Sequence, residues 1–357
     1  MITDPEVFHE TRLPRELLHR DSETSQLSRI LKPAVSGHYP EDALITGPSG
    51  VGKTVLARFL LDNPQQPTAV ATTHIRALGM TCGDLLREAI NDHPSGTTVH
   101  RGTPTADLPQ ILQELVDDPY LLIIDEADDV PETDALDMLA GVPEVATIVI
   151  AHDADDWFAR VDSRYRSRFD GDHHIRLTRY TATELADILE PRAEFGLESG
   201  AVSREQLVTI GNIVAGVARR GIQTLRWAAK IAENQDHDAI TDRDITDGRA
   251  RAQTEIRESN LRSLPYHHHV LYELIRAHDT LESSKLHDSY EAIQEHAYAK
   301  NRPQHPISRR ARRTKLDKLR EYDLIDWTEH EDNSRMYRVI DASIASEFDI
   351  PLTPLGR

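Results

Sequence analysis

The stretch Gly47–Thr54 constrains the fold of this chain more than any other. Its sequence, Gly-Pro-Ser-Gly-Val-Gly-Lys-Thr, matches the phosphate-binding pattern G-x-x-x-x-G-K-[ST] at every fixed position. The apolar run Ala43–Thr46 before it predicts a buried strand, and Val55–Leu61 after it predicts a helix. Glycines let the backbone wrap closely around a polyphosphate, and the helix N-terminus adds its positive dipole end. We therefore expect a nucleotide-binding loop made of Gly47, Pro48, Ser49, Gly50, Val51, Gly52, Lys53, Thr54 and Val55.

An acidic pair follows about seventy residues later, at the end of a second strand. Tyr120–Ile124 is fully apolar, as expected of a parallel strand covered on both faces, and Asp125 and Glu126 follow it. In open parallel sheets, ligands bind at the carboxyl ends of the strands. Lys53 and Thr54 are expected to reach the phosphates and Mg²⁺, and Asp125 to hold the same Mg²⁺. Glu126 is expected to orient the attacking water, so the two motifs together predict ATP hydrolysis.

Composition limits the class of protein. The chain has 357 residues, which suggests two or three domains, and it contains no run of eighteen apolar residues that would predict a transmembrane helix. Residues 1–6 do not have the pattern of a secretory signal. Cys82 is the only cysteine, which excludes an intrachain disulfide and a multi-cysteine zinc site. We expect a cytoplasmic protein whose metal is Mg²⁺, and no metal site at His267–His269.

The net charge of −19 would ordinarily argue against binding to nucleic acid. However, arginine greatly outnumbers lysine, and the acidic residues are spread along the whole chain. This pattern resembles proteins adapted to a cytoplasm of high salt, in which net charge reflects the solvent. Local charge must then indicate the partner.

The last hundred residues carry such a local charge. Residues 270–278, 283–300 and 308–322 predict helices, and residues 323–327 and 336–340 predict two strands joined by a turn that contains Asp332 and Asn333. Three helices and a hairpin predict a winged helix, whose third helix would lie in a major groove of DNA. The alternative is a solvated basic face, or one that faces an acidic protein. The residues expected to bind DNA are Arg309, Arg310, Arg312, Arg313 and Lys315 on the helix and Arg335 and Arg338 on the wing.

The whole set resembles the AAA+ ATPases, and more narrowly the archaeal replication initiators related to the eukaryotic origin recognition complex. We expect an α/β P-loop domain with a parallel sheet over residues 1–170, a helical lid over 171–255, and a winged-helix domain over 256–357. The matching parts are the lead-in Pro14–Glu23, the loop, the acidic pair, Tyr180–Leu189, Gly216–Arg219 and the basic C-terminal helix.

The resemblance assigns further residues. It implies that Tyr180 and Arg192 contact the nucleotide and that Arg219, from the lid, reaches the γ-phosphate. His152 or Asp153 stands where the family has a sensing Asn, and Val217 stands for the usual Asp.

The segment Ser167–Phe169 resembles the box that supplies an arginine finger, Arg168, to the ATP of a neighbouring subunit. The alternative is that this arginine and Arg164 pair with nearby acids, namely Asp155, Asp156 and Asp162. The family would also insert a DNA-gripping helix within residues 75–100, but that stretch contains few basic residues.

These features imply a slow ATPase that initiates DNA replication. It would bind origin duplex DNA together with other copies of itself and help to recruit or load the replicative helicase. The alternative is a nucleotide-locked, weakly hydrolysing regulator that binds DNA on a plasmid or at promoters; His152 and Val217 favour it. A clamp-loader subunit is a third interpretation, against which the basic winged helix argues.

Overall fold

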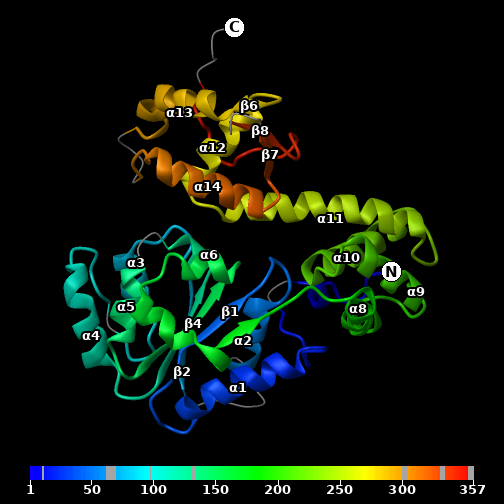
Figure 1. Ribbon diagram of the computed structural model, residues 1–357. Coiled ribbons are helices and arrows are strands. Elements are labelled where there is room, and N and C mark those ends of the chain that lie inside the picture. The colour runs from blue at the N-terminus through cyan, green and yellow to red at the C-terminus, as the bar shows by residue number, and fades with distance from the viewer. Residues whose placement is uncertain are drawn as a thin grey trace. The chain divides into compact units, whose positions relative to one another are not determined.

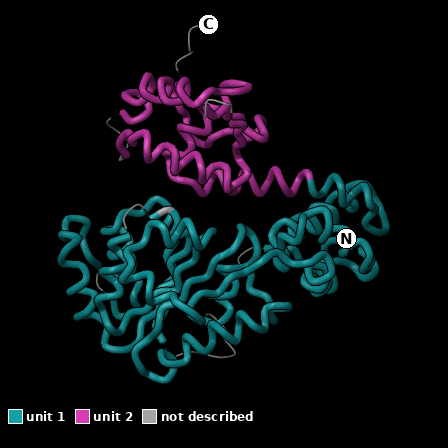
Figure 2. The backbone as a smooth tube through the Cα atoms, viewed as in Figure 1, with its two compact units in different colours: residues 1–249 teal, residues 250–357 magenta. Residues whose placement is uncertain are grey.

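The chain folds into two compact units, residues 1–249 and residues 250–357 (Figure 2). The computed structural model describes residues 1–9, 12–61, 70–96, 98–130, 133–299, 304–329 and 334–352. Each unit has its own buried apolar residues, such as Leu122 in the first and Leu316 in the second. In this part of the chain, no helix is both long enough and apolar enough to cross a membrane.

A five-stranded parallel sheet forms the centre of the first unit, with strand order β2-β3-β4-β1-β5 (Figure 1). The central strands are buried on both faces, which explains their continuous apolar sequences. The strand predicted at 43–46 is confirmed, whereas β5 was not predicted because it is only three residues long. The strands are β1 (Ala43–Thr46), β2 (Ala71–Arg76), β3 (Tyr120–Asp125), β4 (Val145–Ala151) and β5 (His174–Arg176).

Helices cover both faces of this sheet. On one face, α1 and α2 pack against β1, β3 and β4, and on the other face α3, α4 and α5 pack against the alternate residues of the same strands. The crossovers place the carboxyl ends of β1, β3 and β4 at one edge, where the site residues lie. The helices are α1 (Asp21–Val35), α2 (Lys53–Leu61), α3 (Cys82–Asn91), α4 (Leu108–Leu115), α5 (Asp134–Ala140), α6 (Ala154–Phe158) and α7 (Ser163–Arg166), with 3-10 turns η2 (Thr105–Asp107), η3 (Ala127–Asp129), η4 (Ser167–Phe169) and η5 (Gly171–His173).

A helical lid completes the first unit. Capping boxes at Thr181–Glu184 and Ser203–Gln206 start its first two helices, because each side chain satisfies an N–H that the helix leaves open. A 3-10 turn near the N-terminus, η1 (Pro5–Phe8), inserts Val7 and Phe8 into the core of this lid. The lid helices are α8 (Ala182–Gly196), α9 (Arg204–Ile213), α10 (Ala218–Asn234) and the first part of α11 (Asp242–Ser263).

Two expectations differ from the structure here. The lid was expected to end at residue 255, but its last helix, α11, runs from Asp242 to Ser263, because no proline follows until Pro265. Within residues 75–100, the helix α3 buries its apolar face against the sheet, so it is a core helix of the α/β layer. Residue 97 lies outside the described residues.

Among the described residues, the second unit contains the last part of α11, three further helices and a small antiparallel sheet of order β6-β8-β7. The two strands predicted from the sequence pair with Trp327 opposite Tyr337, and β6 adds a third strand. Asp332 and Asn333, which were expected in the turn, lie outside the described residues. The elements are α12 (Tyr266–Arg276), β6 (Leu281–Glu282), α13 (Ser283–Ala297), α14 (Arg309–Glu321), β7 (Ile325–Glu329) and β8 (Arg335–Val339).

Consecutive histidines on α12 have three different partners. The Nδ1 atom of His267 lies 2.8 Å from the Tyr298 hydroxyl, and that of His268 lies 3.2 Å from the Pro265 carbonyl. His269 binds the Ser346 hydroxyl at 2.8 Å and the Leu264 carbonyl at 3.1 Å. Burial lowers the pKa of all three, to about 4 for His267, and also lowers the pKa of the buried His287 on α13. All four imidazoles are therefore harder to protonate in the folded unit than in the unfolded chain.

The second unit is expected to lose stability as the pH falls from 7 to 5. The unfolded chain protonates these histidines near pH 6.5, and the folded chain protonates them only at lower pH. Their contribution to stability is therefore complete above pH 6.5 and decreases as the pH falls below it. Each such proton costs about 1.4 kcal/mol of unfolding free energy per pH unit. Urea unfolding of the full chain, followed by Trp327 fluorescence in a Trp157→Phe/Trp227→Phe background, measures this. An unchanged midpoint between pH 7 and pH 5 would contradict it.

Candidate functional site

The predicted phosphate loop connects β1 to α2 at the carboxyl edge of the sheet. Gly47, Gly50 and Gly52 all have positive φ (147°, 77° and 99°), which lets the backbone turn tightly. A Cβ atom on Gly47 would lie 2.3 Å from the carbonyl oxygen of Leu177, so no other residue fits there. The Lys53 ammonium donates to the carbonyls of Gly47 and Pro48 at 2.6 and 3.1 Å. A cation held at the mouth of a Gly-rich loop can exchange these carbonyls for phosphate oxygens.

Asp125 and Thr54 meet directly beside this loop. The Thr54 hydroxyl donates to Asp125 Oδ2 at 2.7 Å, and His74 Nε2 lies 3.4 Å from the same oxygen. Burial opposes ionisation of Asp125, but the bonds from His74 and Thr54 outweigh it and lower the carboxyl pKa. A hydroxyl and an ionised carboxylate that converge beside a phosphate loop form the oxygen donor set that Mg²⁺ prefers. The residues present therefore fit a magnesium ion.

Glu126, the predicted water-orienting residue, is held by a residue that sequence reasoning did not assign. Arg76 lies at the end of β2. Its Nε atom donates to Glu126 Oε1 at 2.9 Å, and its Nη2 atom lies 2.7 Å from the same oxygen. The register pairs Arg76 with Asp125, so the guanidinium sits beside the acidic pair. The backbone of Glu126 has φ +57° and its N–H donates to Asp125 Oδ1 at 2.9 Å. The exposed positions 74 and 76 alternate with buried ones, a signal that was available in the sequence.

His152 lies next to the loop, as its position after β4 implied. Its carbonyl accepts the Gly47 N–H at 3.2 Å, and its own N–H donates to Asp128 Oδ2 at 2.6 Å. Asp153 is occupied otherwise, because its carboxylate caps α6 by accepting the N–H groups of residues 155 and 156. Of the two candidates for a sensing side chain, His152 is therefore the one that has no helix-capping role here.

The lid touches the phosphate loop through its third helix. The Arg219 N–H donates to the Gly50 carbonyl at 3.3 Å, and a Cβ atom on Gly50 would lie 2.8 Å from Val217 Cγ1. Val217 is the residue before α10 and provides no side-chain cap to that helix. This valine, which replaces an acid in the family pattern, instead packs against the loop. The loop and the start of α10 are thus in direct contact.

Tyr180 and Arg192 also belong to this region of the lid. The Tyr180 N–H donates to the Gly216 carbonyl at 3.1 Å, and Arg20 both donates to the Tyr180 hydroxyl at 3.0 Å and stacks over its ring at 4.1 Å. Burial raises the pKa of Tyr180 and lowers that of Arg192, whose guanidinium donates to the Ile188 carbonyl at 3.0 Å. The buried Arg20 lies in the predicted lead-in, but no motif singled it out.

Arg168 forms a half-buried ion pair in this chain. Its Nε contacts Asp42, and its Nη1 donates to the Ala140 carbonyl at 3.2 Å. Asp42 is buried and accepts both the N–H and the hydroxyl of Thr147 at 2.6 and 2.8 Å. The partner is therefore Asp42 and not one of the three acids considered from the sequence. Arg164 does pair with Asp162, at 3.2 Å, and remains 86% exposed.

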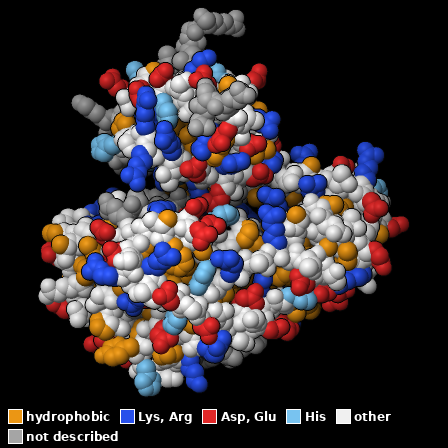
Figure 3. All heavy atoms as spheres, in the orientation of Figure 1, with side chains coloured by type: hydrophobic (Ala, Val, Ile, Leu, Met, Phe, Trp, Pro, Cys, Tyr) orange, Lys and Arg blue, Asp and Glu red, His pale blue; other side chains and the backbone are white. Residues whose placement is uncertain are grey.

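The basic helix of the second unit presents only some of its arginines to solvent. Arg309, Arg310 and Arg313 are exposed, and Lys315 is half-buried. On the hairpin, Arg335 is 34% exposed and Arg338 is 60% exposed. Basic and acidic side chains lie intermixed over this unit (Figure 3). A polyanion could therefore contact this face through several guanidinium groups.

The prediction that Arg312 belongs to the DNA-binding set is corrected by its burial. Its side chain is 4% exposed; it donates to the His287 carbonyl and to Glu291, each at 3.1 Å, and stacks on Tyr290 at 4.4 Å. The helical period turns this residue toward α13 while its neighbours face outward. Lys318 is buried in the same way.

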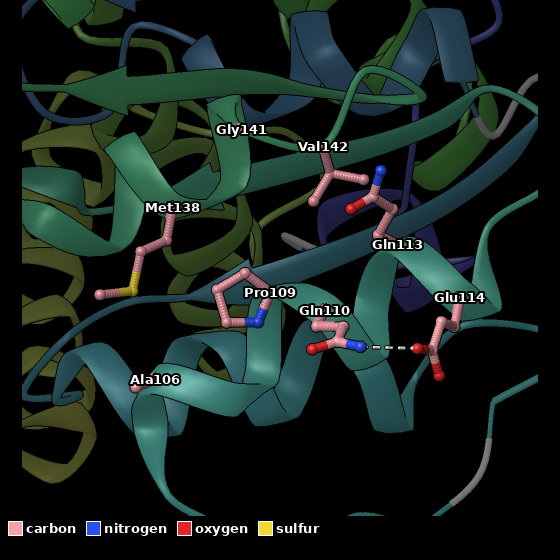
Figure 4. Close-up of a pocket in the computed structure, with 8 residues that line it drawn as sticks. All are labelled: Ala106, Pro109, Gln110, Gln113, Glu114, Met138, Gly141 and Val142. Carbon is pink, nitrogen blue, oxygen red and sulfur yellow. Dashed lines mark hydrogen bonds between the residues drawn. The ribbon is translucent and has the colours of Figure 1, made fainter.

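One further pocket lies between α4 and α5 and has a volume of about 500 Å³. Its side chains point into a shallow space, and Gln110 donates to Glu114 at 2.9 Å (Figure 4). Its lining includes neither a residue of the loop Gly47–Thr54 nor the acidic pair. The lining residues are Ala106, Pro109, Gln110, Gln113, Glu114, Met138, Gly141 and Val142.

Arg76→Ala is expected to raise the rate of ATP hydrolysis. If Glu126 orients the attacking water, as the sequence predicts, it must first leave Arg76. A partly exposed ion pair is worth about 1 kcal/mol, or about fivefold in rate. Turnover with saturating ATP measures the change, and KM for ATP should stay within about twofold. Arg76→Lys, which keeps the charge, is the matched control. A fall in turnover of the alanine variant would instead assign Arg76 a supporting role in hydrolysis.

Comparisons with known proteins agree with this geometry. A family model for the AAA ATPase domain matches residues 16–150, and one for the Cdc6 AAA+ ATPase-type lid domain matches residues 186–250. The chain is 31% identical over 349 residues to ORC1-type DNA replication protein 9 of Halobacterium salinarum, covering 97% of this chain and 96% of the relative. ORC1-type DNA replication protein 1 of the same organism is 32% identical over 297 residues, covering 81% and 95%.

Solved structures show the same fold. The Aeropyrum pernix ORC1 protein, in a complex with DNA, matches with a TM-score of 0.72 at 20% identity, covering 98% of this chain and 94% of that one. The ORC2 protein of that organism, in ADPNP and ADP complexes, matches with a TM-score of 0.60 at 22% identity, covering 96% of each chain. With a loop, an acidic pair and a lid arranged as above, the chain belongs to the family of ORC1-type DNA replication proteins, AAA+ ATPases with a Cdc6-type lid.

Proposed function

We propose that this protein is an ATP-dependent initiator of DNA replication that binds origin duplex DNA and helps to recruit the replicative helicase. The observation that carries the proposal is the contact of Arg219 and Val217 with Gly50, because it couples a nucleotide loop to the lid. The named relatives are DNA replication proteins, which supports this role. The proposed divisions are a nucleotide-binding domain over 1–170, a lid over 171–255 and a DNA-binding domain over 256–357.

In the proposed ATPase cycle, each residue has one task. The loop N–H groups and Lys53 bind the phosphates, and Thr54 with Asp125 would hold Mg²⁺, which neutralises charge on the phosphate oxygens. Glu126 accepts a proton from, and orients, the attacking water once it is released from Arg76. Tyr180, Arg192 and Arg219 close the lid over the nucleotide.

Assembly of copies on DNA is proposed to complete the site. An arginine from a neighbouring copy would stabilise charge on the transferring phosphoryl group. Arg168 would have to give up its bond to the buried Asp42 to do so, whereas Arg164 is already 86% exposed. We therefore assign Arg164 as the first candidate for this role and Arg168 as the second.

The second unit is proposed to be a winged helix that binds duplex DNA. Its third helix, α14, would enter the major groove with Arg309, Arg310, Arg313 and Lys315, and the β7–β8 hairpin would bring Arg335 and Arg338 to the backbone. The structure of the Aeropyrum relative in a complex with DNA supports this use of the fold.

One alternative has an observation in its favour. A nucleotide-locked regulator would bind ATP or ADP and DNA without appreciable turnover. The Arg76–Glu126 ion pair and the valine at position 217 favour it, because both oppose a hydrolysing arrangement. A single-turnover ATPase assay with and without duplex DNA separates the two functions.

Genome-wide mapping of bound DNA tests the proposed function directly. We expect peaks at replication origins, and we expect them to disappear in a Lys53→Ala variant, because the proposed initiator binds origins only with nucleotide bound. Peaks confined to promoters would establish the regulator instead. A protein that fails to bind duplex DNA in vitro would contradict both.

A further inference from the structure

Several arginines on the proposed DNA-binding face already have carboxylate partners on the same surface. Arg309 lies 3.3 Å from Glu291 and 3.8 Å from Asp288, and the arginine itself is 59% exposed. Arg338 Nη2 lies 3.5 Å from Asp326 Oδ2. These arginines are among those expected to meet phosphates, so the acids lie where a polyanion would lie.

Several such arginine–carboxylate pairs lie close together on the hairpin, around Asp326 and Trp327. Arg320, from the last turn of α14, lies 3.5 Å from Asp326, which it shares with Arg338. Arg335 lies between Glu329 at 3.2 Å and Asp317 at 3.6 Å. The Trp327 ring stacks between the guanidinium groups of Arg320 and Arg335, at 4.2 and 4.6 Å. The ring keeps both cations beside the acids.

Other basic residues of α14 differ from these. Arg310 and Arg313 are exposed, and no ion pair of either is found in the part of the chain that the structure describes. The carboxylate partners thus form two groups, one on α13 beside Arg309 and one around the hairpin; the second group consists of Asp317, Asp326 and Glu329. Surface ion pairs are weak and are screened by salt. Each arginine of the hairpin group, namely Arg320, Arg335 and Arg338, can therefore exchange its carboxylate partner for a phosphate.

We propose that duplex DNA binding by this unit exchanges the carboxylates of Asp317, Asp326 and Glu329 for phosphates, and that the released carboxylates take up cations from solution. The inference rests on the proposed function and adds its regulation by ionic strength. A carboxylate left beside DNA without its arginine lies in a strongly negative potential, and a bound monovalent cation relieves the repulsion.

The release and uptake of ions on binding determine how the DNA affinity depends on salt. Each phosphate contact releases counterions from DNA and contributes about −0.9 to the slope of log K against log salt. Each cation taken up contributes with the opposite sign, so the net slope is shallower than the number of phosphate contacts requires. The acids thus weaken binding at low salt and preserve it at high salt.

The test compares the full-length wild type with Asp317→Asn/Asp326→Asn/Glu329→Gln on one fluorescent duplex, by anisotropy from about 0.1 to 1 M KCl. The triple variant is expected to bind about 100- to 1000-fold more tightly at the lowest salt, because its slope should be steeper by about two to three over this tenfold range of salt. The two affinities should converge at the highest salt. Circular dichroism checks that the exposed, nearly isosteric substitutions leave the fold intact.

A matched control separates the local effect from total charge. Asp117→Asn/Asp118→Asn/Glu194→Gln makes the same change in net charge at exposed positions of the first unit, and it should leave the slope within about half of one unit of the wild type. An equal slope in wild type and hairpin variant would overturn the inference, as would an equal effect of both triple variants. A wild type that binds no duplex would instead overturn the proposed function.

Discussion

Glu126→Gln is expected to bind ATP as tightly as the wild type and to hydrolyse it at least about 100-fold more slowly, because general-base assistance contributes about 10² to 10⁴ in rate. The amide keeps the shape of the side chain but cannot accept the proton of water. The substitution also removes the charge that Arg76 binds at 2.7 Å, so it does not trap the residue in that ion pair. Fluorescent-nucleotide binding and single-turnover hydrolysis measure the two effects separately.

Two further variants serve as controls for this result. Glu114→Gln changes an exposed carboxyl of α4 in the same chemical way and should leave both quantities unchanged. Lys53→Ala should lose nucleotide binding, because its ammonium lies at the loop carbonyls where phosphates would replace them. Hydrolysis by Glu126→Gln at the wild-type rate would remove Glu126 from its role and direct attention to His152.

The nucleotide site was predictable from sequence because its geometry is encoded locally. The loop between a buried strand and a helix needs Gly47, Gly50 and Gly52 for its positive φ angles, and a continuous apolar run predicts a central parallel strand. The chain then has few ways to place Asp125, since β1 and β3 both pair in parallel with β4, which brings their carboxyl ends to the same edge of the sheet. The 2.7 Å bond from Thr54 to Asp125 follows from that topology.

The partners of these residues were not predictable, because they come from distant parts of the chain. Arg76 reaches Glu126 only through the pairing of β2 with β3, and Arg168 reaches Asp42 across 126 positions of sequence. Each partner is one charged residue among many in a chain of net charge −19. Periodicity was informative but unused for Arg312, which shares its helix face with the buried Leu316 and Leu319.

Burial of Arg312 decides how the DNA-binding helix should be tested. A glutamate at this position would place a second carboxylate beside Glu291 in a site that is 4% exposed, and an unpaired buried charge destabilises a protein by several kcal/mol. Lost DNA binding would then report unfolding. The informative substitutions lie on the exposed face of α14 instead.

Arg310→Glu/Arg313→Glu is expected to lower duplex affinity by at least about 100-fold at about 0.2 M salt, since two attractions to phosphate become two repulsions. Both side chains are exposed, so the folded unit should persist. The slope of log K against log salt should become shallower by about two, which identifies lost phosphate contacts. Anisotropy titrations over a range of salt concentrations measure both quantities.

Arg29→Glu/Arg243→Glu provides the matched control. These residues are 68% and 86% exposed in the first unit, and reversing them makes the same change in net charge. If the affinity depends on α14, this control loses less than about threefold, because it leaves every charge of that helix in place. An equal loss in both variants would mean that total charge alone sets the affinity, and retained binding in the α14 variant would place the DNA on another surface.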